Sequence, residues 1–422
     1  MIARKEERKR SCRLLTANLP ALVLLLTVLL VLASSPRIGA AADPEVKVGK
    51  RVEITSSHRY CWFPTIHRFP TGEIMATMRM SPDENNPEGD FSAYCISKDG
   101  GMTWGRRYTM GSGANMDASW SYEPEEDGTI LHLYSWVERY PLGQNRDFYL
   151  TLTRWSRGGM EFQQWRDVPL HLPEHIIFYS PRTIDHYDSD GHLAEIPRLC
   201  PWGTIVHGLN GDLLAVMFIK TVERPNYWQD VLICSHDEGK TWEQRSVVAA
   251  VEAEDKPWPW MGKEGPNESA LVRLADGRLL AVFRTGRVGR TGEFASMGET
   301  WSSDDGKTWT PPIAAPFKGV APRLRRLSNG MLALTTGRPD PVEVMFSVDG
   351  KGKEWTNATT VAEDHPQELS GGCTHYTDFI EVEPDKLLVI YDEVPYGWYE
   401  ISPADRKSKN IIYGTFVEIQ RR

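Results

Sequence analysis

The chain has 422 residues, 41% of them hydrophobic and 10% aromatic, and its 48 Lys and Arg against 57 Asp and Glu give a net charge of −9. The length would fit two average domains, yet closed all-β architectures often form one unit of this size. The hydrophobic fraction suffices for a core, and the acidic balance argues against nucleic acid as a partner.

Residues 1–42 predict a signal peptide. A basic stretch, residues 4–13, precedes an apolar run from Leu19 to Ala33, and cleavage after Ala42 fits the small-residue pattern of such sites. The run is shorter than the ~20 residues that a membrane span needs, so an uncleaved anchor is the weaker alternative. We expect a secreted or periplasmic mature chain, residues 43–422, that is not inserted in a membrane. Without seven basic and two acidic residues of the leader, it carries 41 basic and 55 acidic residues, net −14.

Five cysteines remain in the mature chain: Cys61, Cys95, Cys200, Cys234 and Cys373. Their number is odd, and they show neither a C-x-x-C motif nor metal-ligand spacing. We expect mostly buried small hydrophobic side chains, with room for one disulfide, and no structural zinc site.

A turn followed by an apolar strand recurs along the mature chain. Each copy opens with a Gly, Asn or Asp turn that closes a hairpin and continues as a strand apolar enough to be buried on both faces. The six copies are TGEIMATM (71–78), DGTILHLYSW (127–136), NGDLLAVMF (210–218), DGRLLAVFR (276–284), NGMLALTTGR (329–338) and PDKLLVIYDE (384–393). Because another apolar stretch precedes each copy, we expect six hairpins.

A second repeat, S-x-D-x-G-x-T-W, alternates with the first. The full copies are SKDGGMTW (97–104), SHDEGKTW (235–242) and SSDDGKTW (302–309), and SVDGKGKEW (347–355) is a degenerate one. In such a hairpin turn the Asp carboxylate accepts backbone N–H bonds, Gly adopts positive φ, and Trp packs under the next strand. These are Asp-box repeats.

The two repeats together predict an all-β fold, a six-bladed β-propeller with Asp-box repeats. Six hairpins spaced by roughly 50 to 80 residues match blades of four short strands around a channel. No long segment shows sustained 3.6-residue periodicity, so little helix is expected. A two-sheet sandwich with long insertions is the alternative, but it gives no reason for a repeating Asp box. In a propeller, loops on one face converge on the axis, where a pocket is expected.

These features resemble the sialidase (neuraminidase) superfamily, whose exo-sialidases are six-bladed Asp-box propellers, over essentially the whole mature chain. The resemblance implies an Asp shortly after the first blade's apolar strand, and ATMRMSPDENN (76–86) supplies Asp83 there. Asp83 would be the general acid/base, with Asp90 as the fallback. A catalytic acid needs a raised pKa, which desolvation over an apolar pocket supplies. Without the resemblance, Asp83 would be an ordinary loop residue.

Two further segments are similar to sialidase stretches. NESALVRLADGRLLAVFR (267–284) places Glu268 and Arg284 at the same end of one hairpin. HYTDFIEVEPDKLLVIYDE (375–393) places Tyr376 at the position of the nucleophile. A phenol with an ordinary pKa of about 10 needs a neighbouring base, which is the role of Glu268 in the family. Taken alone, Tyr376 would be a core or strand-edge aromatic.

Sialidases bind the substrate carboxylate with several arginines, and this chain matches that pattern at one position and lacks it at another. Arg338 in TTGRPDPVEVMFS (335–347) corresponds to one of them, with Arg323 as a competitor. The family's first blade begins with Phe/Tyr-Arg-Ile-Pro, whereas this chain has CWFPTI (61–66), so Trp62 replaces the first arginine. An indole removes a charged fork and adds a stacking face, which should weaken carboxylate binding and favour a sugar ring.

Other arginines and tryptophans of the sequence are further candidates for this substrate-binding site. The neighbouring arginines that would compensate for Trp62 are Arg59, Arg68 and Arg79. The tryptophans that would line a carbohydrate site, or else fill the propeller core, are Trp202, Trp228 and those of DKPWPWMG (255–262).

The leading functional hypothesis is a secreted retaining exo-glycosidase of sialidase type. Tyr376 would attack the anomeric carbon with Glu268 as its base, Asp83 would protonate the leaving oxygen, and Arg284 with Arg338 would orient an anionic or polar group. The substrate is a terminal sialic acid or related sugar of a glycan, and no metal or organic cofactor is required. The alternatives are a glycosidase for a non-sialic sugar, a non-catalytic glycan-binding propeller and a protein-interaction platform, which the fold alone does not separate.

Overall fold

The computed structural model describes residues 43–57, 61–80, 91–109, 121–124, 127–133, 138–139, 148–156, 161–172, 199–221, 223–288, 293–338, 341–363, 376–394 and 409–420. Within these ranges all helical or strand elements are strands, none is a helix, and this confirms the all-β prediction. The same ranges contain no helix long and apolar enough to cross a membrane. Asp43–Arg422 form one compact unit, and the predicted signal peptide, residues 1–42, lies outside the described residues.

The described strands form five sheets. Three four-stranded sheets follow the chain: β2 (Cys61–Arg68), β3 (Ile74–Met80), β4 (Phe91–Ser97) and β5 (Tyr108–Thr109); β15 (Asn267–Arg273), β16 (Leu279–Arg284), β17 (Ser296–Ser302) and β18 (Ile313–Lys318); β19 (Val320–Arg326), β20 (Leu332–Gly337), β21 (Val342–Ser347) and β22 (Thr359–Ala362). The fourth four-stranded sheet joins distant parts of the chain: β23 (Asp378–Glu383), β24 (Lys386–Glu393), β25 (Asn410–Gln420) and β1 (Glu45–Ser57).

The fifth sheet has nine strands in two groups. The first group is β6 (Ser121–Pro124), β7 (Thr129–Leu133), β8 (Glu138–Arg139), β9 (Phe148–Ser156) and β10 (Glu161–His171). The second group is β11 (Cys200–His207), β12 (Leu213–Thr221), β13 (Arg224–Ser235) and β14 (Trp242–Ala249). Short parallel pairings, β6 with β11 and β10 with β14, join the groups.

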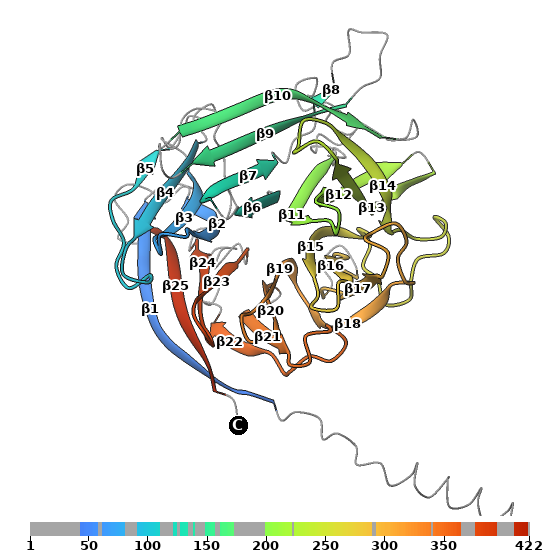
Figure 1. The fold of residues 1–422 in the computed structure, drawn as a ribbon. Helices are drawn as coiled ribbons and strands as arrows, with labels where there is room; N and C mark the ends of the chain where they lie inside the picture. Colours follow the sequence, from blue (N-terminus) through green and yellow to red (C-terminus); the bar gives the residue numbers. More distant parts are fainter. Residues whose placement is uncertain are drawn as a thin grey trace, which may run out of the picture. The chain divides into compact units, whose positions relative to one another are not determined.

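The sheets follow one another around a ring within this unit, with the first strand of each toward the middle (Figure 1). Contacts between β11 and β15, β15 and β19, and β2 and β23 link neighbouring sheets at the centre, and β6 contacts β11 within the nine-stranded sheet. All six predicted turn–strand copies form the second strand of an antiparallel hairpin. The fold is therefore propeller-like.

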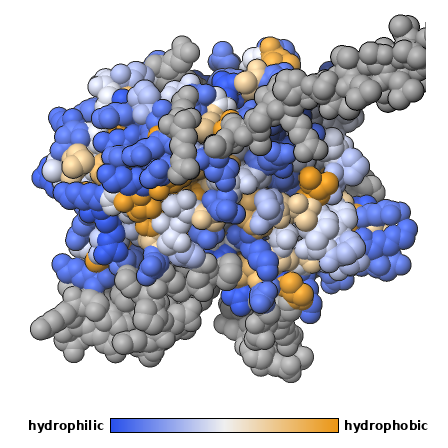
Figure 2. Space-filling model, turned by 90° about the horizontal axis from the view of Figure 1, so that it is seen from below, coloured by the Kyte–Doolittle hydropathy of each residue, from blue (hydrophilic) through white to orange (hydrophobic). Residues whose placement is uncertain are grey.

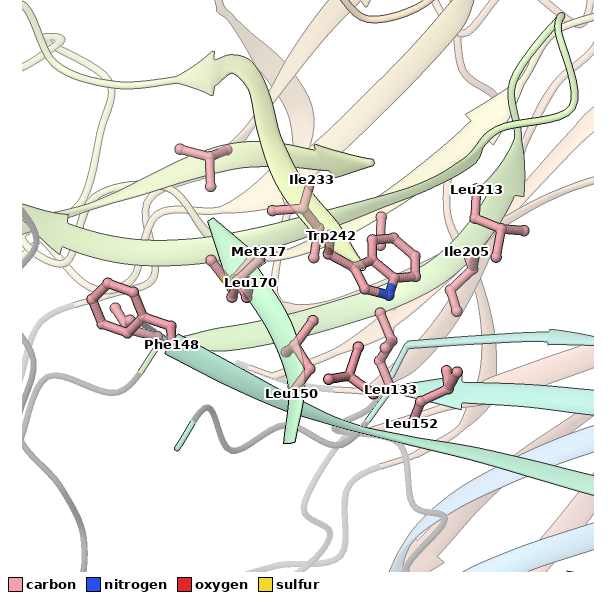
Figure 3. Packing of buried hydrophobic residues seen from close by; sticks show 14 of the residues in the cluster. Leu133, Phe148, Leu150, Leu152, Leu170, Ile205, Leu213, Met217, Ile233 and Trp242 are labelled. Atoms are coloured by element: carbon pink, nitrogen blue, oxygen red, sulfur yellow. The ribbon is translucent and has the colours of Figure 1, made fainter. Parts of the chain in front are cut away.

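Apolar side chains fill the space between neighbouring sheets, which is why the second strands are apolar on both faces. In β16 the run Leu279–Phe283 is buried throughout. Figure 3 shows the core between the two groups of the nine-stranded sheet, where the Trp242 indole shares one cluster with Leu133 and Ile205. Full burial of such large side chains stabilises each by about 1.5–3 kcal/mol.

The Asp boxes have the predicted turn chemistry. In the three full copies an aspartate accepts a hydrogen bond at 2.9 Å from the backbone N–H of a threonine four residues on: Asp99 from Thr103, Asp237 from Thr241 and Asp304 from Thr308. Gly239 has a φ of 89°. The indole of Trp242 donates to the carbonyl of Gly239 at 3.2 Å and packs in the core, as the sequence predicts.

One face of the described surface is mainly hydrophilic (Figure 2), and the described cysteines are buried. On the face shown in Figure 2, hydrophilic residues predominate and hydrophobic residues form small groups. Four cysteines are buried and free, as expected of small hydrophobic side chains: Cys61, Cys95, Cys200 and Cys234. The fifth, Cys373, lies outside the described residues.

Candidate active site

Four of the central strands bulge near their first residues. In β2, β11, β15 and β19 the pairing with the second strand of the hairpin shifts register there. Each shift contains a residue of positive φ: Phe63 (52°), Gly203 (90°), Glu268 (48°) and Ala321 (41°). A bulge turns a side chain away from its regular direction and is common beside active sites. Positive φ costs a residue with a side chain about 1–2 kcal/mol, so these positions need support from their surroundings.

The Glu268 carboxylate is the meeting point of this region. Its Oε1 accepts a hydrogen bond from the Tyr376 hydroxyl at 2.6 Å and another from Arg284 Nη1 at 2.7 Å. Its Oε2 accepts the backbone N–H of Ala321 from the next bulge at 3.1 Å. Glu268 is 7% exposed and Tyr376 6% exposed, so all these bonds form away from bulk water.

The surroundings of Glu268 and Tyr376 determine which of the two side chains carries a proton. Burial alone would raise the pKa of the Glu268 carboxyl, but the charge of Arg284 and the hydrogen bonds from Tyr376 and Arg284 hold that pKa below its ordinary value. Burial, followed by the charge of Glu268, raises the pKa of Tyr376 well above its ordinary value. Glu268 is therefore ionised and Tyr376 protonated near neutral pH, with the phenolic proton directed at the carboxylate.

Arg284 is held by two carboxylates. Asn267 and Arg284 are cross-strand partners, so the hairpin brings Glu268 and Arg284 to the same end of the sheet. Arg284 Nη2 donates to Glu264 Oε1 at 2.9 Å while Nη1 donates to Glu268. Both ends of the guanidinium are thus engaged by protein carboxylates rather than open for a substrate carboxylate. The sequence does not indicate Glu264 as a site residue, because it lies in the irregular segment before β15, outside any repeat.

Aromatic rings surround the Tyr376 side chain. The ring of Phe63 lies 4.7 Å from that of Tyr376, and Trp202 meets Tyr376 edge-on at 5.8 Å. The Arg338 guanidinium lies 5.8 Å from the Tyr376 ring centroid. Of the two arginines proposed for this place, Arg338 is therefore at the site, whereas Arg323 is 2% exposed and lies 5.7 Å from the ring of Tyr122. Trp202, Tyr376 and Phe63 pack together in one largely buried cluster.

Trp62 lies one residue before the Phe63 bulge. It is 9% exposed, and its ring is 5.5 Å from that of Phe63. Its cross-strand partner is Arg79, which is half-buried, so the two side chains share one face of the sheet. Arg68 is at the opposite end of β2 and donates to the carbonyl of Glu381 at 3.3 Å, which removes it as a substitute for the missing arginine.

The remaining predicted residues fall into two groups. Asp83, Asp90 and Arg59 lie outside the described residues. Trp228 packs edge-on against Phe218 at 5.0 Å, Phe218 lies 6.0 Å from Trp202, and the rings of Trp258 and Trp260 stack on each other at 5.1 Å.

Comparison with known proteins agrees with this architecture. Residues 203–384 match the family described as BNR repeat-like domain. No curated protein matches the sequence. A solved structure of a protein of unknown function from Dyadobacter fermentans is 20% identical, with a TM-score of 0.63 over 89% of this chain and 99% of that one.

Two other solved structures carry named activities. The Hadza microbial sialidase Hz136 is 14% identical, with a TM-score of 0.54 over 86% of this chain and 65% of its own. The α-L-arabinanase of Penicillium chrysogenum, solved with arabinobiose, is 16% identical, with a TM-score of 0.55 over 88% of this chain and 98% of its own. The family match covers less than half of the chain, and these solved structures share its fold.

Proposed function

We propose that this chain is a secreted, six-bladed retaining exo-glycosidase in which Tyr376 is the nucleophile and Glu268 its base. One observation carries the proposal: the Tyr376 hydroxyl donates to Glu268 Oε1 at 2.6 Å inside a buried site. A phenol is a weak nucleophile unless a positioned base removes its proton as it attacks. Glu268, kept ionised by Arg284, is such a base.

The reaction follows the double displacement of retaining glycosidases. The Tyr376 oxygen bonds to the anomeric carbon while its proton passes to Glu268, and the bond to the leaving oxygen breaks as a carboxylic acid protonates that oxygen. Water then attacks the anomeric carbon, giving its proton to the carboxylate that acted as acid, and the phenolate leaves and recovers its proton from Glu268.

Asp83 is the proposed acid. It follows Met80 by three residues, and Met80 pairs with Cys61 at the end of β2 that carries Phe63. Because Phe63 contacts Tyr376, a side chain three residues beyond that end is within reach of the site, given about 3.3–3.6 Å of extended chain per residue.

The sugar is a terminal sialic acid or a related acidic residue in the leading version of the proposal. A neutral phenol suits an anionic sugar, because a carboxylate nucleophile would repel the substrate's own charge. Arg338, beside Tyr376, supplies a cation for that charge.

A second candidate, a glycosidase for an uncharged sugar, is favoured by the charges of the described residues. Arg284 is already paired with Glu264 and Glu268, and Trp62 stands where the sialidase pattern has an arginine. A substrate carboxylate would then meet Arg338 without help from Arg284 or from an arginine at position 62, while the aromatic rings favour a sugar face.

The test is release of 4-methylumbelliferone from a panel of α-sialosides and of neutral and uronic glycosides. We expect Tyr376→Phe to lose about 10³-fold or more in kcat/KM on the substrate that the native chain cleaves. Tyr413→Phe is the matched control, since Tyr413 lies on β25 against Arg51, and it should retain activity.

The panel separates the candidates. Turnover of sialosides that disappears in Tyr376→Phe supports the sialidase-type version, and turnover of other glycosides alone moves the substrate but keeps the mechanism. Full activity in Tyr376→Phe would refute the assigned nucleophile. Glycan binding without turnover on any substrate would instead favour a non-catalytic glycan-binding propeller.

A further inference from the structure

Three metal-binding side chains converge on the hairpin between β13 and β14, outside the candidate active site. Cys234 is near the end of β13, His236 is in the Asp-box turn, and Glu243 is near the start of β14. Cys234 and Glu243 are cross-strand partners, so their side chains lie on the same face. The donor atoms of all three residues lie within 4.8 Å of one another.

The two distances from the His236 imidazole match those of a tetrahedral zinc site. His236 Nε2 is 3.7 Å from Cys234 Sγ and 3.4 Å from Glu243 Oε1. A tetrahedral Zn²⁺ with bonds of ~2.3 Å to sulfur and ~2.0 Å to nitrogen and oxygen separates S from N by about 3.6 Å and N from O by about 3.3 Å. The two distances from His236 are thus within about a tenth of an ångström of those around Zn²⁺, and Cys234 Sγ lies within 4.8 Å of the Glu243 carboxylate.

A fourth residue fixes the imidazole. His236 Nδ1 lies 2.7 Å from Asp212 Oδ1, and an ionised carboxylate only accepts, so Nδ1 carries the proton. The lone pair of Nε2 then faces Cys234 and Glu243. A carboxylate behind a metal-bound histidine is a regular feature of zinc sites, where it sets the tautomer and the ring orientation. Asp212 is itself buried and held by Arg245.

The Asp-box turn itself does not require this donor set. At the positions of Cys234, His236 and Glu243, the first box has Ile96, Lys98 and Gly105, the third Trp301, Ser303 and Thr310, and the fourth Phe346, Val348 and Thr356. All four turns form with the same serine–aspartate hydrogen bond, at 2.8–3.0 Å. The three donors in the second box thus need another explanation.

We propose that Cys234, His236 and Glu243 bind one Zn²⁺ ion, with water as the fourth ligand and Asp212 as the positioning residue. Thiolate, imidazole and carboxylate together select zinc over the hard cations Mg²⁺ and Ca²⁺. The spacing of the cysteines does not indicate this site, because its donors meet across a hairpin. Bound metal would connect β13 to β14 and stabilise the folded state by an amount that rises with the logarithm of the free metal concentration above the Kd.

Cobalt titration of the chelator-treated mature chain tests the site, because Co²⁺ reports both thiolate ligation and tetrahedral geometry in its absorption spectrum. We expect one equivalent to produce a sulfur-to-cobalt charge-transfer band in the near ultraviolet, which Zn²⁺ abolishes by displacement. Cys234→Ser should lose this band, and Asp212→Asn should weaken binding by about 10–100-fold.

A matched pair of exposed carboxylates completes the test. Glu243→Gln should weaken binding by about tenfold or more, and Glu238→Gln, in the same turn with its side chain 78% exposed, should leave it unchanged. Circular dichroism verifies that each variant is folded. The absence of the charge-transfer band in the native chain, or its persistence in Cys234→Ser, would overturn the proposal and leave His236 as an ion-pair partner of Asp212 and Glu243.

Discussion

The burial of Glu299 predicts how the free energy of unfolding depends on pH. The side chain on β17 is 1% exposed, and the Trp355 indole donates to its Oε1 at 2.7 Å. Burial raises the pKa of Glu299 from an ordinary 4.5 to about 8. Between these two values the folded chain holds a proton that the unfolded chain has lost, so the free energy of unfolding falls as the pH rises through this window and then levels off.

The size of the effect follows from the shift. A difference of about 3.5 pKa units at ~1.36 kcal/mol each corresponds to about 5 kcal/mol, and partial relaxation of the buried group makes a few kcal/mol the practical value. Glu299→Gln keeps an oxygen that accepts from Trp355 and removes the titration. We expect the variant to gain stability relative to the native chain as the pH rises from about 5 to about 8.

Denaturant unfolding followed by tryptophan fluorescence at several pH values measures this difference. Glu293→Gln is the control, because its side chain is 85% exposed and should not alter the pH dependence. A constant difference between native chain and Glu299→Gln across the range would show that Glu299 titrates normally and would refute the reasoning.

Two further predictions concern the residues that build the candidate site. Gly203→Ala should destabilise the fold more than Gly211→Ala. Both glycines have a φ of 90°, but only at Gly203 would an added Cβ lie 2.2 Å from a backbone oxygen, that of Ser269. Equal losses of unfolding free energy in the two variants would contradict this. Arg284→Met should lower the free energy of unfolding by about 3–5 kcal/mol at about pH 8 and by less at about pH 5. The substitution leaves Glu268 buried without its cation and so raises the pKa of the carboxyl, which Arg284 now lowers. A loss of unfolding free energy that is independent of pH would contradict this reasoning.

Much of the fold was predictable because it depends on repeated local patterns. Each turn–strand copy, such as DGRLLAVFR, combines turn residues with an apolar run, and these short-range preferences agree with the hairpins that form. The nine-stranded sheet was not predicted. It arises because two short parallel pairings, β6 with β11 and β10 with β14, join strands that are distant in the sequence, and no local pattern encodes these contacts.

The candidate site was predictable where a motif carried it and not elsewhere. Tyr376, Glu268 and Arg284 come from segments that resemble a known family, and they meet in the structure. Glu264 and the Ala321 N–H belong to irregular backbone, where partners depend on how separate sheets pack. The direction of each side chain at a bulge, including that of Phe63, likewise depends on a local register shift that the alternation of apolar residues does not reveal.

The pairing of β1 with β25 has a consequence for the order of biosynthesis. Ser57 pairs with Asn410, 353 residues later, and at the usual 5–20 residues per second translation takes about 20–70 s to cover that distance. Throughout that time β1 is an edge strand without its partner, a shape that invites aggregation. Its sequence is protected against this: Lys47, Lys50 and Arg51 interrupt the apolar residues, and charges of this kind keep unpaired strands in solution until the last strand arrives.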